Sequence, residues 1–304
     1  MFRFKNRQKV CDVSGVKIGG QPGENATALA GTIFYGKHEI VRDARSGVFE
    51  KAEAAKLIKS MEEASAQTHV PGLLQIFFET QEAGERYVDF CAEQTKMPLV
   101  IDSADGVARA KVAEYCSEIG IAERVIYNSV NLSITEKELE ILADANCYSA
   151  IVLAFNPTGA GVEGKIKLLE DGAGIVKEGL LAIAERVGMK NLLIDPAALP
   201  FGQKSSHLHA LPALKAKYGL PVGCGIHNVP SAWKWLKKRR EAHVADIASN
   251  LVPITLGADF VLFGPIENAG DVFPATAMAD IMVAEAMSIH GVKPVKEHPA
   301  NYLL

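Results

Sequence analysis

Four short apolar segments of this chain each end in a side-chain carboxylate or amide. The residues at these ends are Asp102, Asn128, Asp195 and Asn228. Carboxylates and amides accept hydrogen bonds, and amides also donate them, but together they offer little acid–base power. Two Asp and two Asn side chains gathered in one place would suit a heterocycle rich in N–H and C=O groups, such as a pterin.

Each of these side chains has a local alternative role. Asp102 opens the segment Asp-Ser-Ala-Asp, which is a credible helix N-cap region. Asn128 would serve as a turn residue, and Asn228 stands two residues before a proline that suits a first helical turn. Asn156 precedes Pro157 and favours a turn over a ligand contact. The recurrence at equivalent segment ends favours ligand binding for the first four.

Strand-like and helix-like patterns alternate along almost the whole chain, which predicts a parallel sheet covered by helices. We expect strands over residues 27–35, 73–78, 99–102, 124–128, 149–156, 191–195, 221–225 and 258–263. We expect helices over 51–67, 82–95, 107–119, 135–145, 211–218 and 274–290, with others ending near 187 and starting near 230.

Eight such units predict an α/β fold with a single (β/α)8 TIM barrel that occupies residues 1–304 as one domain. In such a barrel the strand ends converge on one mouth, so the four polar residues would meet there. A doubly wound open sheet is the alternative. Residues 1–25 form an N-terminal extension, expected as a hairpin that closes the base of the barrel or flanks its mouth.

Composition narrows the class of protein. The 304 residues carry a formal charge of −4, with 48% hydrophobic and 22% charged residues. This net charge does not indicate the basic surface that is typical of nucleic-acid-binding proteins. The start of the chain lacks the apolar core of a secretory signal, and the longest apolar stretch is far too short to span a membrane. Five scattered cysteines without a CxxC pair predict reduced thiols in a cytoplasmic protein.

Several motifs resemble the pterin-binding barrel family, which holds corrinoid-linked methyltransferases and the dihydropteroate synthases. They are Ile-Asp-Ser-Ala from 101, Ile-Tyr-Asn-Ser-Val-Asn from 126, Leu-Ile-Asp-Pro from 193 and His-Asn-Val from 227. Residues 16–23, 32–35 and 220–225 resemble more closely the H subunits of tetrahydromethanopterin S-methyltransferase and their soluble bacterial relatives in glycine betaine metabolism. The resemblance covers nearly the whole chain.

This resemblance implies a site and a reaction. Asp102, Asn128 and Asp195 would bind the pterin edge, with Ser103 and Asn156 as further contacts. Asn228 would lie beside the N5 atom that exchanges the methyl group. The expected reaction moves a methyl group from methylcobalamin, carried by a partner corrinoid protein, to N5 of tetrahydrofolate. The alternative is a tetrahydromethanopterin-specific subunit of a larger methyltransferase complex, and the family suggests a homodimer.

The chain also departs from parts of that family. It lacks the lysine after strand 7 and the Ser-Thr-Arg-Pro loop of the synthases, which disfavours pteroate synthesis. It lacks an Asp-x-His-x-x-Gly cobalamin signature, so the corrinoid is expected on another protein. Schiff-base chemistry of a barrel aldolase would need a strand-end lysine, and the predicted strand ends carry none.

Weaker patterns suggest other sites. Cys224, His227, His207 and His209 have metal-like spacings, but a zinc site needs a third placed ligand, so we expect no metal bound by this chain. Residues 257–264 resemble a phosphate-binding turn, with a plain strand-to-helix turn as the stronger alternative.

A basic segment follows the seventh predicted strand and is interleaved with Trp233 and Trp235. Read as a helix, it presents either a solvated face or a rim where a partner protein docks. Its charged residues are Lys237, Lys238, Arg239 and Arg240.

Overall fold

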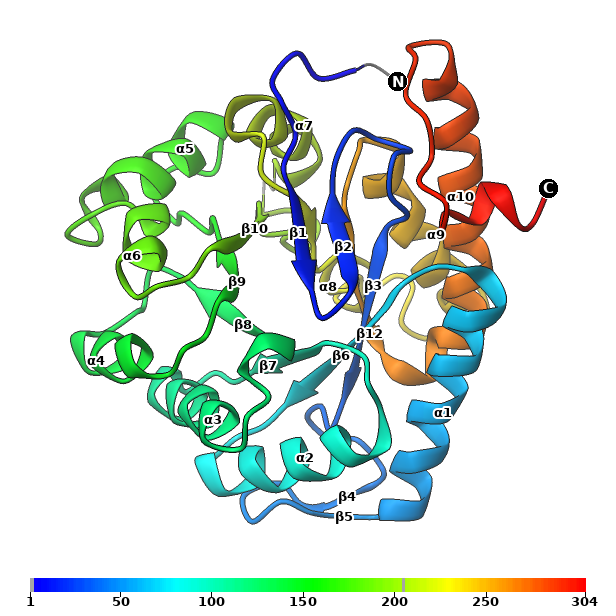
Figure 1. Cartoon of the computed structure of the whole chain (residues 1–304). Helices are drawn as coiled ribbons and strands as arrows, with labels where there is room; N and C mark the ends of the chain where they lie inside the picture. The colour runs from blue at the N-terminus through cyan, green and yellow to red at the C-terminus, as the bar shows by residue number, and fades with distance from the viewer. Residues whose placement is uncertain (1–2, 204–205) are drawn as a thin grey trace.

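Eight parallel strands form a closed barrel in the computed structural model, which describes residues 3–203 and 206–304 (Figure 1). The strands are β3 (Ala28–Ile33), β6 (Gly72–Phe77), β7 (Leu99–Asp102), β8 (Val125–Val130), β9 (Ser149–Leu153), β10 (Asn191–Asp195), β11 (Gly223–Cys224) and β12 (Phe260–Pro265). They pair in the order β10-β9-β8-β7-β6-β3-β12-β11. A parallel bridge between Ile194 and Val222 joins the two ends of this order. The predicted barrel is therefore confirmed over the open sheet.

Helices ring the barrel (Figure 1). They are α1 (Lys51–Thr68), α2 (Gln81–Gln94), α3 (Gly106–Glu118), α4 (Glu136–Asp144), α5 (Val162–Asp171), α6 (Leu180–Arg186), α7 (His207–Tyr218), α8 (Asn228–Ser231), α9 (Ala242–Thr255) and α10 (Ala269–Ser288). Side-chain caps fix several starts: Thr80, Asp105 and Thr135 accept hydrogen bonds from the first-turn amides of α2, α3 and α4.

Short elements complete the chain. A small antiparallel pair, β4 (Val41–Asp43) and β5 (Val48–Phe49), precedes α1. The 3-10 turns are η1 (Ala122–Arg124), η2 (Gly172–Gly174), η3 (Ile266–Asn268) and η4 (Pro299–Asn301). No helix in the part of the chain that the structure describes is long and apolar enough to cross a membrane.

The N-terminal hairpin closes the base of the barrel. It consists of β1 (Val10–Val13) and β2 (Val16–Gly19), paired antiparallel. The Asn191 amide, at the start of β10, donates to the Asp12 carbonyl at 3.1 Å. The hairpin's buried side chains share one apolar cluster with those that fill the barrel lumen: Cys11, Val13, Ile18, Ala30, Leu73, Val100, Ile126, Ile151 and Leu193. Packing at this end leaves the opposite mouth for a ligand.

Two helix predictions needed correction. The helix expected to end near 187 is two helices, because Gly172 adopts a left-handed φ of 77° that ends α5. The last helix begins at Ala269 rather than at Pro274. A proline is favoured in a first helical turn, which is why the pattern placed the start there, but here it lies inside the helix.

The prediction of a helix over the basic segment was wrong. After the four residues of α8, residues 232–241 form successive turns. The Leu236 amide donates to the Trp233 carbonyl and the Arg239 amide to the Leu236 carbonyl, both at 2.9 Å. Leu236 is the one buried residue between 231 and 240. A helix draws most of its stability from a packed apolar face, and this segment has none to pack.

Candidate functional site

A cavity of about 390 Å³ lies at the barrel mouth, where the carboxyl ends of the strands converge. Its walls come from seven of the barrel strands, from Tyr35 just after β3 and from the loop that follows the remaining strand, β11. They comprise Thr32, Tyr35, Gln75, Asp102, Asn128, Ser129, Leu153, Asp195, Gly225, His227, Asn228, Leu262, Gly264 and Pro265. The four polar residues predicted to meet at the mouth, Asp102, Asn128, Asp195 and Asn228, all line this cavity.

Asp102 is the last residue of β7 and faces the cavity rather than capping the next helix. The cap of α3 is Asp105, whose carboxylate accepts from the amides of Val107 and Ala108. A hydrogen-bonded row instead fixes Asp102: the Thr32 hydroxyl donates to Gln75 Oε1 at 3.0 Å, and Gln75 Nε2 donates to Asp102 Oδ2 at 2.7 Å. The second carboxylate oxygen is left available for a ligand.

Burial sets the electrostatics of Asp102. Desolvation raises the pKa of this carboxyl above its usual range, while the Gln75 hydrogen bond and the nearby Arg109 guanidinium partly offset the rise. A ligand that donates N–H groups to Asp102 would favour its charged form in the same way.

Asp195 ends β10 on another side of the cavity, and its side chain is 7% exposed. The Ala197 amide donates to Oδ1 at 2.7 Å and the Gly225 amide to Oδ2 at 3.2 Å. Burial raises the pKa of Asp195 to about 6, against the lowering effect of those two amides and of Lys165. Each carboxylate oxygen has two lone pairs, so Asp195 retains acceptor capacity toward the cavity.

The two amides bring hydrogen-bonding groups without internal partners. Asn128 is the register partner of Asp102 on the adjacent strand β8, so the two side chains lie side by side. Asn228, the first residue of α8, is exposed and does not cap that helix, whose N-cap is His227. Neither side-chain amide bonds to another residue within 3–203 and 206–304. Both are therefore free to serve a ligand.

Two further residues expected at the site lie outside the cavity walls. Asn156 is buried and organises its own loop, since its Oδ1 accepts from the Thr158 and Gly159 amides and its Nδ2 donates to Gly164. Ser103 is buried too, and its hydroxyl accepts from the Asp105 amide at 3.2 Å. In this structure both support loops next to the site.

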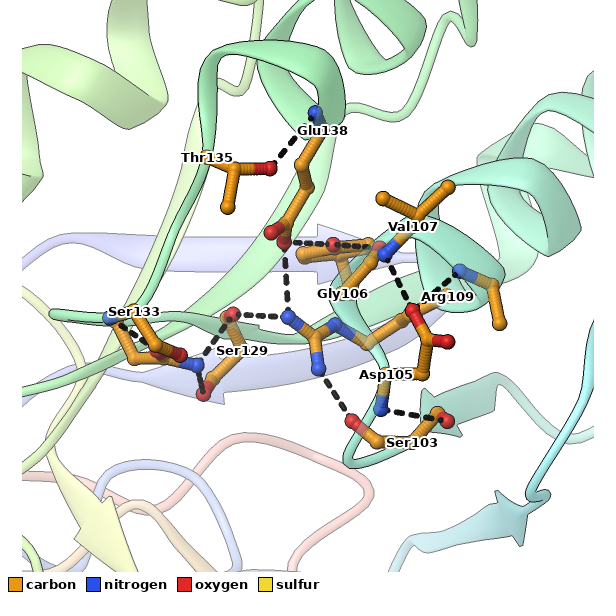
Figure 2. Close-up of polar contacts among 12 residues, drawn as sticks. Ser103, Asp105, Gly106, Val107, Arg109, Ser129, Ser133, Thr135 and Glu138 are labelled. Carbon is orange, nitrogen blue, oxygen red and sulfur yellow. Dashed lines mark hydrogen bonds and ion pairs between the residues drawn. The ribbon is translucent and has the colours of Figure 1, made fainter.

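A buried ion pair ties together the loops that carry Asp102 and Asn128 (Figure 2). The Arg109 guanidinium of α3 donates to the Ser103 carbonyl, to the Ser129 carbonyl at 3.1 Å and to Glu138 Oε1 at 2.8 Å. The Tyr127 hydroxyl also donates to Glu138. Ser103 and Ser129 directly follow Asp102 and Asn128. Arg109 therefore holds the backbone just beyond both ligand-facing side chains.

Substitution of Arg109 should destabilise the fold. Arg109→Met would leave the Glu138 carboxylate, 1% exposed, without its charged partner. Breaking a buried pair in this way costs about 3–5 kcal/mol. We expect that loss in urea unfolding, and a smaller one in the double variant Arg109→Met/Glu138→Leu. An Arg109→Met protein whose free energy of unfolding stays within about 1 kcal/mol of wild type would contradict the assignment.

A protein-family model matches almost the whole of this chain, including all residues that line the cavity. The model is described as the tetrahydromethanopterin S-methyltransferase MtrH subunit and matches residues 6–295. The chain belongs to this family.

Curated relatives support the same membership in the MtrH family. The H subunit of tetrahydromethanopterin S-methyltransferase from Methanothermobacter thermautotrophicus is 49% identical over 310 residues, covering 100% of each chain. The H subunit of a putative mtx methyltransferase from Methanosarcina acetivorans is 46% identical over 310 residues, with the same coverage. The resemblance to the H subunits is thus confirmed, and it places the chain among methyltransferase subunits.

Solved structures support the barrel. Dihydropteroate synthase from Xanthomonas albilineans in complex with 7,8-dihydropteroate aligns with a TM-score of 0.57 at 20% identity, covering 92% of this chain and 98% of that one. The Yersinia pestis dihydropteroate synthase aligns with a TM-score of 0.58 at 14% identity, covering 90% and 98%. At such identities the likeness shows the fold alone.

The cavity of this MtrH-family chain also contains residues to which the sequence pattern gave no ligand-binding role, and three of them have polar contacts that the fold explains. Gln75 is the one polar residue in the apolar strand β6, a signal that was available. Tyr35 follows β3, and its hydroxyl donates to Glu267 at 2.9 Å. His227 was considered only for a metal site, yet it lines the cavity and contacts Asp246. The partners Glu267 and Asp246 are distant in sequence, so only the fold reveals these contacts.

The metal alternative gains no support from the geometry. Among the residues with described positions, no three His, Cys, Asp or Glu side chains form a group that could hold a metal ion. Cys224 is fully buried, and burial raises the pKa of its thiol well above the usual range. The Gly257–Gly264 segment also serves packing, since Gly264 lies against the His227 ring.

Proposed function

We propose that this chain is a pterin-binding methyltransferase subunit that moves a methyl group between N5 of a reduced pterin and a corrinoid carried by a partner protein. The observation that supports this most strongly is the barrel-mouth cavity, where two anchored carboxylates face two amides without internal partners. Such a rim recognises a heterocycle with several N–H and C=O groups and contains no obvious nucleophile for covalent catalysis.

The proposed binding mode follows from the hydrogen-bonding inventory. A pterin's amino-pyrimidinone edge offers an exocyclic amine and a ring N–H, and a carboxylate accepts such parallel donors well. Asp102 and Asp195 would accept from this side of the ring system, with Asn128 beside Asp102. Asn228 would lie next to N5, where its amide can donate or accept. The protein would then act mainly by positioning the two reactants.

The reaction is a displacement at the methyl carbon. The N5 lone pair forms the new C–N bond, the cobalt–carbon bond breaks, and its electron pair stays on cobalt. The corrinoid supplies this leaving group, while the side chains of this chain orient the pterin and accommodate the change of charge at N5.

The names of the relatives favour tetrahydromethanopterin over the tetrahydrofolate that the sequence analysis preferred. Relatives at 49% and 45% identity over full length are named as H subunits of tetrahydromethanopterin S-methyltransferase. We therefore propose tetrahydromethanopterin as the substrate, within a larger complex. The cavity residues would contact the ring edge that both pterins share, so affinity must be measured for each.

The test is calorimetric titration of the purified chain with each reduced pterin, followed by turnover with free methylcobalamin. We expect one binding site, a lower Kd for tetrahydromethanopterin, and formation of the 5-methyl pterin. Tighter binding and faster turnover of tetrahydrofolate would restore the first substrate assignment. Failure to bind or methylate either pterin would refute the proposed function.

The basic segment is a candidate rim for the partner corrinoid protein. Lys237, Lys238, Arg239 and Arg240 are all exposed on the turns that follow α8. Rim charges mainly alter encounter rate and its salt dependence. We expect Lys237→Glu/Lys238→Glu to slow turnover with the protein-bound corrinoid by about tenfold at low salt, while sparing free methylcobalamin.

A matched control for this prediction lies at the other end of the barrel. Lys5 and Arg7 are exposed near the N-terminal hairpin, and Lys5→Glu/Arg7→Glu should not change the rate with either donor. Equal effects of the Lys237/Lys238 reversal on both donors, or none, would show that the turns form only a solvated surface.

We also propose a homodimer, supported by exposed apolar side chains along α10 and at its C-cap. Met278 and Met282 of α10 and the C-cap residue Ile289 are 53%, 62% and 82% exposed and recur at helical spacing. Exposed apolar patches of this kind mark interaction sites. Light scattering on the purified chain distinguishes a dimer from a monomer.

A further inference from the structure

A histidine–aspartate pair forms part of the cavity wall, next to Asn228. His227 Nδ1 lies 2.9 Å and 3.1 Å from the two carboxylate oxygens of Asp246 in α9. The Asn268 amide donates to Asp246 Oδ2 at 3.2 Å. Three separate elements, the loop before α8, helix α9 and the 3-10 turn η3, therefore converge to orient one imidazole.

The His227 ring packs against Gly264 and leaves its Nε2 atom accessible from the cavity. A Cβ placed on Gly264 would approach His227 Cγ within 2.4 Å, so only glycine lets the ring lie against β12 here. The His227 side chain is 26% exposed. Its Nε2 bonds to no residue in the described ranges, although the ring lines the cavity. Nδ1 of His227 is thus bound to Asp246, while Nε2 is available to a ligand in the cavity.

This arrangement determines what His227 can do chemically. A carboxylate that accepts from Nδ1–H fixes the tautomer in which Nε2 carries a lone pair, as in other base–orienter pairs. The remaining polar groups of the cavity are less suited to take a proton. Amides are not bases at neutral pH, and the Tyr35 hydroxyl donates to Glu267. The carboxylates of Asp102 and Asp195 are committed to the far edge of the pterin in the proposed binding mode.

We propose that His227, oriented by Asp246, is the base that takes the proton released from pterin N5 during methyl transfer; this inference rests on the proposed function. As the N5 lone pair attacks the methyl carbon and the cobalt–carbon electron pair leaves with the corrinoid, the N5–H bond breaks. Its electron pair stays on N5 and the proton binds Nε2, so the base acts in the step that transfers the methyl group. The resulting imidazolium is stabilised by Asp246 and passes the proton to solvent at the open mouth.

The structure offers a matched control for this proposal. His243 of α9 and Asp271 of α10 form a second pair at 2.8 Å, which is exposed and outside the cavity walls. The test compares His227→Gln, His227→Ala and His243→Gln for affinity toward tetrahydromethanopterin and for single-turnover demethylation of free methylcobalamin, followed by the absorbance of Co(I).

General-base removal typically lowers a rate by about 100-fold or more. We expect His227→Gln to bind pterin within about twofold of wild type while its single-turnover rate falls by that factor, and imidazole to restore part of the rate to His227→Ala. His243→Gln should keep the wild-type rate. A wild-type rate in His227→Gln, or a rate loss matched by lost affinity and not rescued by imidazole, overturns the proposal.

A measurement on the unmodified protein covers the case in which the variants do not fold. Diethyl pyrocarbonate modifies accessible neutral imidazoles, and mass spectrometry locates the adducts. Bound tetrahydromethanopterin should protect His227 and leave His243 reactive. Equal modification of His227 with and without bound pterin would contradict the proposal. Absence of any pterin binding or methyl transfer by the wild-type chain would instead refute the underlying function.

Discussion

Asp102→Ala and Asp195→Ala should each weaken pterin binding by about 10- to 150-fold. Either change removes the acceptor for N–H groups of the pterin edge in a largely buried site. Losing a buried hydrogen bond to a charged group costs about 1.5–3 kcal/mol, which converts to that range of Kd. Calorimetric titration of each variant with tetrahydromethanopterin and tetrahydrofolate measures the effect.

The control is Asp144→Ala, because Asp144 is an exposed carboxylate at the end of α4. The pterin affinity of this variant should equal that of the wild-type protein. Circular dichroism confirms that each variant is folded. Wild-type affinity in both Asp102→Ala and Asp195→Ala, with the fold intact, would remove these carboxylates from the binding site.

A pH titration gives an independent check on Asp195. Its pKa is raised to about 6 by burial, and only the charged form accepts from two donors without a competing proton. Binding therefore favours the ionised carboxylate, and affinity should fall as pH drops below about 6. It should level off above neutrality. In Asp195→Ala this part of the pH dependence should disappear.

Asn228→Ala should affect rate more than binding. The side chain is exposed at the mouth and has no internal partner among the described residues. A donor or acceptor beside N5 acts on charge that changes during the displacement, so its loss falls on the transition state. We expect kcat to fall by about 10- to 100-fold with less than threefold change in pterin affinity.

Steady-state kinetics with free methylcobalamin and titration of the same protein separate the two effects. Asn146→Ala is the control, since Asn146 is an exposed amide in the turn between α4 and β9, before the strand and therefore at the opposite end of the barrel from the cavity. If Asn228→Ala keeps the wild-type kcat, or if weak binding is its whole defect, Asn228 does not act at the reaction centre.

Local patterns were sufficient to predict the barrel and the main polar residues of its mouth. The apolar runs that end in Asp102 and Asp195 are buried strands β7 and β10, and the turn chemistry after them marks the strand ends. Because the carboxyl ends of parallel strands meet in a closed barrel, Asn128 and Asn228 could be placed at the same mouth. This step needed only the order of elements.

Contacts between segments that are distant in the chain leave no local pattern in the sequence. Arg109 and Glu138 are 29 residues apart, and His227 and Asp246 are 19 apart, so no local spacing joins them. Asn156 shows what local spacing does reveal, since the turn-forming role favoured by the following Pro157 is confirmed in the structure. The prediction of a helix over the basic segment was wrong because the pattern of charged and aromatic residues does not reveal whether one side of the segment will pack against the rest of the protein.

A reduced pterin should occupy the barrel-mouth cavity with its amino-pyrimidinone edge on the two carboxylates. A crystal structure of this chain with bound tetrahydromethanopterin decides this question. We expect N–H groups of the pterin within hydrogen-bonding distance, about 2.7–3.2 Å, of Asp102 and Asp195, with N5 facing Asn228. A pterin bound elsewhere on the chain, or bound in the cavity with N5 directed away from Asn228 and neither carboxylate in contact, would contradict it.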